Sequence, residues 1–393
     1  MAGYFADRPN SPAIKVIHII GSLGVGGAEV VLERIVVATR QAGVETMVVS
    51  LTDVGPIGKR LEAHGITVVA LGVRVRSPGS LPSAALRLRS LLRHERPTVV
   101  QTWLYHADLG GGLLARLSGH KAIVWSVHST DLSHGTARAT RWLRVVLARL
   151  SSWIPARVVY VADSARTVHE NLGYAKRVGL VIYNGFDTNV FKPDAASRTQ
   201  VRDALGIPRH AQVIGSFGRF NRDKDHETFF KAARLVLQKH PDTRFLLAGT
   251  GVQIDNDEIV RMMHALELTS EAFHLLGQRD DIPALMRAID VYCLHSRSEA
   301  FPLALGEAMA SGAVPVVTNV GDSALLVQGV GTPVPPEDPH ALFQELDKQL
   351  SEPEAERQMH GQLARQRIVD EFSSAKMVQK YMACYQSLIT EHH

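Results

Sequence analysis

Short apolar segments alternate with amphipathic segments along this chain. Lys15–Ile20 is a mostly apolar run of strand length, and Ala28–Ala42 repeats apolar residues at helical spacing until Gly43 ends the pattern. Further apolar runs of strand length follow at Thr46–Leu51, Thr67–Leu71, Thr98–Gln101, Ile123–Val127 and Val158–Ala162. This alternation predicts parallel strands joined by crossover helices, as in a doubly wound sheet.

The alternation is interrupted once and then begins again. Asn184–Asp187 has the composition of a turn, and Phe191–Ser197 is interpreted as a linker. Helical patterns at Glu227–Lys239 and Asp257–Leu268 then separate new strand-like runs, at Val213–Phe217, Phe245–Gly249, His274–Leu276, Val291–His295 and Val314–Thr318. We therefore predict an α/β protein with two Rossmann-like doubly wound domains that face each other across a cleft, at residues 1–190 and 205–375.

Composition narrows the class of protein. A chain of 393 residues with 45% hydrophobic and 21% charged residues is typical of a soluble globular protein with two domains. Only Cys293 and Cys384 are present, so no disulfide framework can form, which favours a reducing compartment. The first residues lack a charged leader followed by an apolar core, and no apolar run has the length of a bilayer span. We expect a cytoplasmic protein.

Two glutamates eight residues apart carry the most specific chemical signal. Glu299 follows the apolar run Asp290–His295, and Glu307 is expected about two turns into the next helix. A carboxylate at a strand-to-helix turn lies beside free helix N–H groups, which can hold a phosphate. A second carboxylate further along can accept two hydrogen bonds from a vicinal diol such as a ribose. The pair indicates a site for a sugar, its diphosphate and its nucleoside.

Two features of the first half could face such a ligand. Gly26 and Gly27 lie in a glycine-rich loop between a strand and a helix, where the backbone can approach a diphosphate; a flexible turn is the alternative. The loop is not a dinucleotide fingerprint, because Glu29 stands where the third glycine should fall. His128 directly follows a strand, where ligands bind in parallel sheets, and could hydrogen-bond a sugar; a packed histidine is the alternative.

Two cations follow the first strand of the second domain. Arg219 and Lys224 can converge on a leaving diphosphate and neutralise its charge, as a metal does elsewhere, unless they belong to an ordinary solvated loop. Asp280 and Asp281 precede a helix and are explained as caps, and no zinc-like spacing of Cys and His occurs. We expect neither a metal nor another cofactor.

Two basic stretches, Arg74–Arg96 and Arg138–Arg157, lie in the first half. The second interleaves arginines with apolar residues and includes Trp142 and Trp153, which suits an anionic membrane surface. An ordinary surface helix with a core-facing side explains it equally well. Nucleic acid is not an expected partner, because the aromatic content is 6% and no recognition motif is present.

Several motifs, taken in order, resemble those of one family. They are GVGGAE near residue 25, a histidine after a strand of the first domain, NGFD, GRFNRDKD, and SRSEAFPLALGEAMASGAVPVV around the two glutamates. From about residue 15 to about residue 375 the chain resembles the retaining family 4 glycosyltransferases, which have the GT-B fold. It departs from the family after Thr318, where Gly321-Asp322 replaces the usual pair of glycines and glutamate.

The resemblance implies transfer of a sugar from a nucleotide-sugar donor to a glycan or glycolipid acceptor, with retention and without a required metal. It implies that Glu307 binds the ribose, that Glu299 faces the sugar hydroxyls, and that Arg219 and Lys224 bind the diphosphate. The backbone N–H groups of Ala300, Phe301 and Leu303 would also reach the phosphates, Gly26 and Gly27 would approach the phosphate or the acceptor, and His128 would contact the sugar. Residues 376–393 would form a C-terminal helix that crosses back to the first domain.

Three functions remain to be compared. The first is a glycosyltransferase at the cytoplasmic membrane face that uses a UDP-sugar to build a lipid-linked glycan or a polysaccharide. The second is a catalytically silent nucleotide-binding partner of another transferase, which the presence of both glutamates, Arg219, Lys224 and His128 disfavours. The third is a nicotinamide-dependent oxidoreductase, which the failed glycine fingerprint disfavours.

Overall fold

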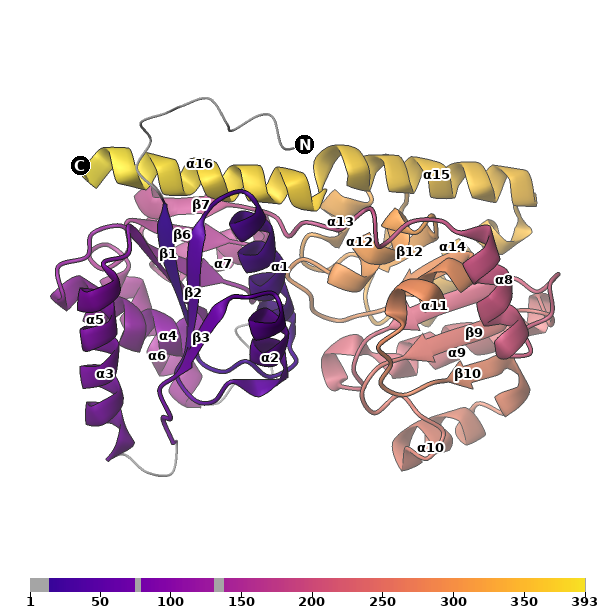
Figure 1. Ribbon diagram of the computed structural model, residues 1–393. Coiled ribbons are helices and arrows are strands. Elements are labelled where there is room, and N and C mark those ends of the chain that lie inside the picture. Colours follow the sequence, from indigo (N-terminus) through magenta and orange to yellow (C-terminus); the bar gives the residue numbers. More distant parts are fainter. Residues whose placement is uncertain (1–13, 75–78, 131–137, 393) are drawn as a thin grey trace. The chain divides into compact units, whose positions relative to one another are not determined.

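The computed structural model describes residues 14–74, 79–130 and 138–392. The chain divides into two compact units, Met1–Asn184 with Ser374–His393, and Gly185–Ser373. Each unit contains a parallel sheet with helices packed on it (Figure 1). The predicted fold class, two doubly wound α/β domains, is confirmed.

The first unit is built on a seven-stranded sheet in the order β3-β2-β1-β4-β5-β6-β7. Its strands are β1 (Lys15–Ile20), β2 (Glu45–Ser50), β3 (Thr67–Ala70), β4 (Val99–Trp103), β5 (Ile123–Val127), β6 (Arg157–Tyr160) and β7 (Gly179–Val181). Its helices are α1 (Gly27–Gln41), α2 (Gly55–Ala63), α3 (Ser80–Glu95), α4 (Leu104–Ala107), α5 (Leu113–Leu117), α6 (Arg138–Leu150), α7 (Asp163–Asn171) and α16 (Ser374–His392), with a π-helical turn η1 (Asp108–Gly112) and a 3-10 turn η2 (Lys176–Val178). The order reverses direction between β1 and β4, whose carboxyl ends flank the expected ligand position.

The second unit is built on a six-stranded sheet in the order β10-β9-β8-β11-β12-β13. Its strands are β8 (Val213–Phe217), β9 (Arg244–Ala248), β10 (Phe273–Leu275), β11 (Val291–Leu294), β12 (Val314–Thr318) and β13 (Pro333–Val334). Its helices are α8 (Ala195–Ala204), α9 (His226–Lys239), α10 (Asp257–Ala265), α11 (Ile282–Ala288), α12 (Leu303–Ala310), α13 (Ser323–Leu326), α14 (Pro339–Ser351) and α15 (Glu354–Glu371), with 3-10 turns η3 (Arg222–Lys224) and η4 (Ser270–Ala272). Here the order reverses between β8 and β11.

The structure differs from the sequence-based expectations in three local details. The segment interpreted as a linker leads into α8, whose first turn is capped by Asp194: its carboxylate accepts a hydrogen bond from the Ser197 N–H at 2.9 Å. Strands β7 and β13 went unpredicted because they are only three and two residues long. Asp281 occupies the N-cap position of α11, but its carboxylate makes no cap hydrogen bond and instead binds the Arg279 guanidinium through two contacts of 2.8 and 2.6 Å.

Helix α16 belongs to the first unit although it ends the chain. It packs on α1 and β4, and the Tyr385 hydroxyl donates a hydrogen bond to the buried Gln101 side chain of β4. Met377, Tyr381, Tyr385 and Leu388, which recur at helical spacing, are all buried. This spacing explains why α16 covers the first unit rather than extending into solvent.

Candidate active site

The charged residues predicted to bind the donor diphosphate and nucleoside gather at one end of the second sheet. Arg219 and Lys224 follow β8, and Glu299 and Glu307 follow β11, the two strands between which the order reverses. Crossover helices run in opposite directions from such a point, so the loops beyond the strand ends separate and leave room for a ligand. The position therefore suits a binding site in the second unit.

Lys224 and Glu299 form an ion pair across this point. The Lys224 ammonium contacts Glu299 Oε1, and the Ser296 hydroxyl donates a hydrogen bond to the same oxygen at 2.7 Å. The Glu299 side chain is 13% exposed and that of Lys224 26% exposed, so both are partly shielded from water. Glu299 is thus held by two donors, and Lys224 is turned toward the loop after β11.

Arg219 lies on a loop whose backbone is held by hydrogen bonds to the end of β9 and the loop that follows it. Gly218 N–H donates to Ala248 O at 2.9 Å and Phe220 N–H to Thr250 O at 2.8 Å, so the loop after β9 continues the sheet pairing. A Cβ at Gly249 would collide with the Gly218 carbonyl oxygen, which requires glycine there. The Arg219 side chain itself is exposed, and within the described parts of the chain it has no hydrogen-bond or ion-pair partner.

Glu307 is buried in the second turn of α12, just over one turn from Leu303 rather than the two turns expected from the sequence. The helix fits closely at this level, because a Cβ at Gly306 would collide with the Phe186 ring. Buried helix geometry therefore fixes where the Glu307 carboxylate lies.

The segment between Glu299 and α12 is held by its neighbours. The Phe301 ring stacks on Phe186 with centroids 6.0 Å apart, and Asp322 N–H donates to Ala300 O at 2.9 Å. Gly321 has φ of +54°, and a Cβ there would collide with the Glu299 carbonyl oxygen. The loop that departs from the family pattern after Thr318 is thus packed directly on the Glu299 segment.

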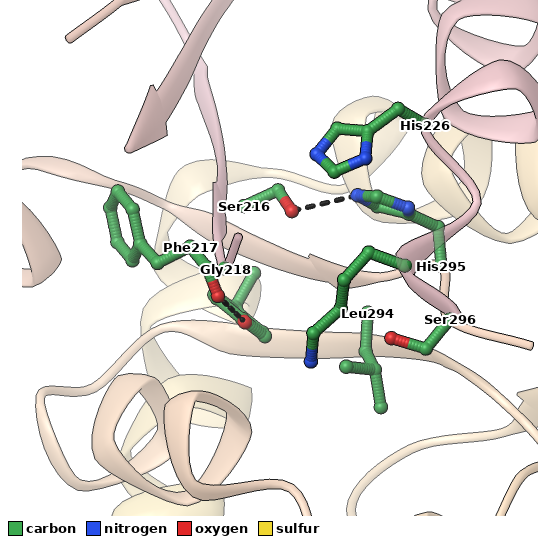
Figure 2. Close-up of a pocket in the computed structure, with 9 residues that line it drawn as sticks. Ser216, Phe217, Gly218, His226, Leu294, His295 and Ser296 are labelled. Atoms are coloured by element: carbon green, nitrogen blue, oxygen red, sulfur yellow. Dashed lines mark hydrogen bonds between the residues drawn. The ribbon is translucent and has the colours of Figure 1, made fainter. Parts of the chain in front are cut away.

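Lys224 lines a small pocket together with two histidines, His226 and His295, that the sequence analysis did not single out. Ser216 Oγ lies 2.8 Å from His295 Nε2, and the His226 and His295 rings meet edge to face with centroids 5.1 Å apart (Figure 2). Burial lowers the pKa of His226 to about 4 and that of His295 well below its usual range. Both rings are neutral near pH 7. The position of His295 directly after β11 was the only available sequence signal.

The glycines predicted to face a ligand lie at the start of α1 in the first unit. Gly26 has extended backbone with φ of −151°, and the nearest group to a Cβ there is the movable Glu29 carboxylate. Apart from its own chain neighbours and the backbone of α1, no atom among the described residues lies within 4 Å of a Cβ built at Gly27. Packing within the unit therefore does not require glycine at either position, and no side chain caps the start of α1.

His128 follows β5 in the same unit, at the carboxyl end of the sheet. Its ring stacks on Trp103 with centroids 5.0 Å apart, and its Nε2 is buried. Burial lowers the pKa of His128 to about 3. The ring is neutral at physiological pH, so it can donate or accept a hydrogen bond but does not carry a positive charge.

Helix α6 has one side packed in the core of the first unit and one side exposed. Arg144, Leu147 and Ala148 are buried, and the Arg144 guanidinium lies 5.1 Å from the Tyr105 ring centroid. Trp142 is 72% exposed, and Arg141 and Arg149 are exposed with it. In the described part of the chain, no helix is both long and apolar enough to cross a bilayer.

The described residues also contain no group of three or more His, Cys, Asp or Glu side chains placed to hold a metal ion. Arg219 and Lys224 supply positive charge at the end of the second sheet.

Comparison with known proteins covers almost the whole chain. Residues 25–190 match the model described as Glycosyltransferase Family 4, and residues 197–367 match Glycosyl transferases group 1. An Escherichia coli protein named UDP-Gal:alpha-D-GlcNAc-diphosphoundecaprenol alpha-1,3-galactosyltransferase is 27% identical, over 62% of this chain and 63% of its own length. The lipopolysaccharide core mannosyltransferase LpsB of Rhizobium meliloti is also 27% identical, over 74% of this chain and 77% of its own.

Solved structures show the same fold. The Anabaena protein HepE, crystallised with UDP, superposes with a TM-score of 0.84 at 22% identity, over 95% of this chain and 100% of HepE. WaaG, a glycosyltransferase of lipopolysaccharide biosynthesis, superposes with a TM-score of 0.71 at 14% identity, over 93% of this chain and 98% of its own. From the two adjoining family matches and this architecture, the chain belongs to the family 4 glycosyltransferases, hexosyltransferase-type enzymes with the GT-B fold.

Proposed function

We propose that this protein transfers a hexose from a UDP-sugar to a lipid-linked or polysaccharide acceptor, with retention at the anomeric carbon and without a metal. The observation that carries the proposal is the Lys224–Glu299 ion pair at the reversal point of the second sheet, with Glu307 on the helix that follows. The donor named for the Escherichia coli relative is UDP-galactose, and HepE was crystallised with UDP and with UDP-glucose, which supports the choice of nucleotide.

In the proposed donor complex, Glu307 accepts hydrogen bonds from the ribose hydroxyls. Arg219 and Lys224 neutralise the diphosphate, whose negative charge grows as the sugar leaves. The N–H groups of Ala300, Phe301 and Leu303 add hydrogen bonds to the phosphates; Pro302 between them has no N–H. In the first unit we assign Gly26 and Gly27 to the phosphate or the acceptor, and neutral His128 to a sugar hydroxyl.

Retention is best explained by front-face attack, in which the departing phosphate accepts the proton of the acceptor hydroxyl. A nucleophilic carboxylate is the alternative, and Glu299 is the candidate. Its Oε1 already accepts from Ser296 and pairs with Lys224, which weakens it as a nucleophile and suits it to orient hydroxyls. We therefore assign Glu299 to sugar orientation.

Binding of UDP to the Glu307→Ala variant tests the ribose assignment. Loss of a buried carboxylate that accepts two hydrogen bonds is expected to raise the Kd for UDP on the order of tenfold or more. Glu345→Ala, on the partly exposed side of α14, is the matched control, and its Kd should equal that of the wild type. An unchanged Kd in a folded Glu307→Ala protein would remove the ribose assignment.

A silent nucleotide-binding partner is the second candidate function. Incubation with a panel of radiolabelled nucleotide sugars distinguishes a transferase from a silent partner. Only a transferase should cleave a donor faster than the protein-free control, either by transfer of the sugar to an acceptor or by hydrolysis when no acceptor is present. Thermal stabilisation by one member of the panel would identify the donor. Stabilisation without any sugar release or transfer, on all acceptors tried, would favour the silent partner.

The metal-free proposal has a direct test. Because Arg219 and Lys224 supply the positive charge, sugar transfer should continue at an unchanged rate in excess EDTA. A strict requirement for added Mg²⁺ or Mn²⁺ would contradict it.

We also propose that the enzyme associates with the inner face of the cytoplasmic membrane through the exposed side of α6. The exposed Trp142, Arg141 and Arg149 support this, since aromatic and basic side chains together favour anionic interfaces. Sedimentation with phosphatidylglycerol vesicles should weaken for the Arg141→Ala/Arg149→Ala variant and for Trp142→Ala. Arg144 is left intact, because it is buried. Equal sedimentation of all variants would leave α6 as an ordinary surface helix.

A further inference from the structure

Arg297 lies between the loop after β8, the loop after β11 and the turn after β13. Its Nη2 donates to Asp225 Oδ1 at 2.8 Å, and its backbone N–H donates to Asp223 O at 2.7 Å. Its Nε lies 2.6 Å from Glu337 Oε1, as an ion pair without hydrogen-bond geometry. One side chain therefore connects the segment that carries Lys224 to the segment that carries Glu299.

Asp225 makes this connection necessary. Its side chain is fully buried, and its backbone is in the left-handed region with φ of +50°, which residues other than glycine adopt uncommonly and aspartate more often than most. Asp225 Oδ1 also accepts from the Thr228 N–H at 3.4 Å as the cap of α9, while Oδ2 has no hydrogen-bond partner within the described residues. A buried carboxylate requires a counter-charge, and Arg297 supplies one.

The position of Lys224 depends on this turn. Lys224 ends the short 3-10 turn η3, which starts at the Asn221 cap and is followed at once by Asp225. With Asp225 held by Arg297 and the backbone of Asp223 hydrogen-bonded to Arg297, the Lys224 ammonium is directed toward Glu299. Without the Arg297 guanidinium, the buried charge of Asp225 would favour a different turn and would move Lys224.

We propose that Arg297 is a positioning residue for the donor diphosphate, which acts through Asp225 on Lys224 and does not itself touch the donor. The proposal rests on the proposed function of Lys224. The arginine fork suits this role because Nη2 and Nε face two different carboxylates, whereas a lysine could contact only one at a time. The contact with Glu337, which is 61% exposed, contributes less than the buried contact with Asp225.

A double-mutant cycle with UDP as the probe tests the proposal. The Kd for UDP is measured by calorimetry for Lys224→Ala, Arg297→Gln and the double variant. Each single substitution should raise the Kd about tenfold, whereas Arg297→Gln should change it less than about twofold once Lys224 is absent. Arg297→Lys should recover part of the affinity, because it restores a charge near Asp225. Arg234→Gln is the control. Arg234 lies on α9 and forms an exposed ion pair with Glu267, and this variant should bind UDP as the wild type does.

The outcomes distinguish failure of the diphosphate role of Lys224 from failure of the positioning role of Arg297. If Lys224→Ala leaves UDP binding unchanged, the diphosphate role of Lys224 and the positioning role of Arg297 both fall. If Lys224→Ala weakens binding but Arg297→Gln does not, or weakens it equally in both backgrounds, only the positioning role falls. Should Arg297→Gln fail to fold, the same comparison is made with Arg297→Lys, for which equal weakening in both backgrounds again overturns the proposal.

Discussion

Glu299 and Lys224 have opposite charges and, in the proposed donor complex, opposite partners. The carboxylate would orient sugar hydroxyls, and the ammonium would meet the diphosphate, yet without a donor they contact each other. A donor therefore has to compete with this ion pair. The arrangement keeps both side chains in place and limits the attraction of the site for unrelated anions.

Glu299→Gln tests this competition at the level of the residue. The amide no longer balances the Lys224 charge, so UDP should bind as tightly as in the wild type or more tightly. Sugar transfer should fall on the order of a hundredfold, because the sugar loses its orienting carboxylate. Calorimetry with UDP and steady-state transfer assays measure the two effects separately. Weaker UDP binding in this variant would place the diphosphate elsewhere.

The buried histidines link stability to pH. His18 is fully buried in β1, its Nδ1 accepts from the Trp103 indole N–H at 3.1 Å, and burial lowers its pKa to about 3. The unfolded chain takes up a proton at this residue below about pH 6.5, whereas the folded chain does so only near pH 3. Acid within this window therefore favours unfolding.

The free energy of unfolding should therefore depend measurably on pH. As pH falls from about 6.5 toward 3, the free energy of unfolding should decrease by up to about 1.4 kcal/mol per pH unit for each such histidine. Urea unfolding at several pH values measures this slope. In the His18→Gln variant the slope should be smaller by up to about 1.4 kcal/mol per pH unit, which corresponds to one proton. An identical slope in the variant would mean that His18 is protonated in the folded protein as well.

At the scale of elements, the loop between β12 and α13 supports the candidate site. Gly321 adopts φ of +54° and leaves no space for a Cβ against the Glu299 carbonyl oxygen, and Asp322 hydrogen-bonds Ala300. A side chain at position 321 would displace either this loop or the segment that carries Glu299. The loop thus acts as a support for the glutamate segment.

Two glycine substitutions distinguish the cost of a steric clash at Gly321 from the cost of placing alanine at positive φ. Gly321→Ala and Gly329→Ala both place alanine at positive φ, +54° and +80°. At Gly329, no described atom other than those of its chain neighbours lies within 4 Å of a Cβ. Gly329→Ala should cost about 1 kcal/mol and leave UDP binding unchanged. Gly321→Ala should cost about 2–4 kcal/mol and weaken UDP binding as well. Thermal unfolding and calorimetry measure both; equal effects would show that the close approach at Gly321 is unimportant.

At the scale of the whole molecule, the last helix stabilises the unit that begins the chain. Helix α16 buries Tyr381, Tyr385 and Leu388 in the first unit, and Tyr385 hydrogen-bonds Gln101 of the central strand β4. The first unit therefore requires two segments of the chain that are far apart in sequence, whereas the second unit is one continuous segment.

Leu388→Ala should lower the free energy of unfolding of the first unit by about 2–5 kcal/mol, because it opens a cavity in a fully buried position. Hydrogen exchange followed by mass spectrometry should show faster exchange in β1 and β4 and unchanged exchange in β8 and β11. Leu363→Ala is the control, since Leu363 lies on α15 and is 49% exposed. Uniformly faster exchange in both units would indicate that they unfold together.

Patterns of neighbouring residues were enough to predict much of this protein. Alternating apolar strands and amphipathic helices predicted the two doubly wound domains, and the ordered motifs from the glycine-rich loop to the two glutamates predicted the family. The short strands β7 and β13 escaped prediction because two or three residues carry no periodicity. The first three residues of α8 were mistaken for part of a linker because they are small and closely follow Pro193 and Asp194.

By itself, the sequence determined the fold class, the family and the residue types placed at the strand ends, because each is encoded in local spacing. Only the tertiary structure decided which of them meet. Lys224 contacts Glu299 across 75 residues, Arg297 contacts Asp225 across 72 and Ser216 contacts His295 across 79. Each of these contacts joins the loops or ends of β8 and β11, which become neighbours only when the parallel sheet pairs them. Long-range strand pairing, which no local pattern records, thus decides how the charges of the candidate site are arranged.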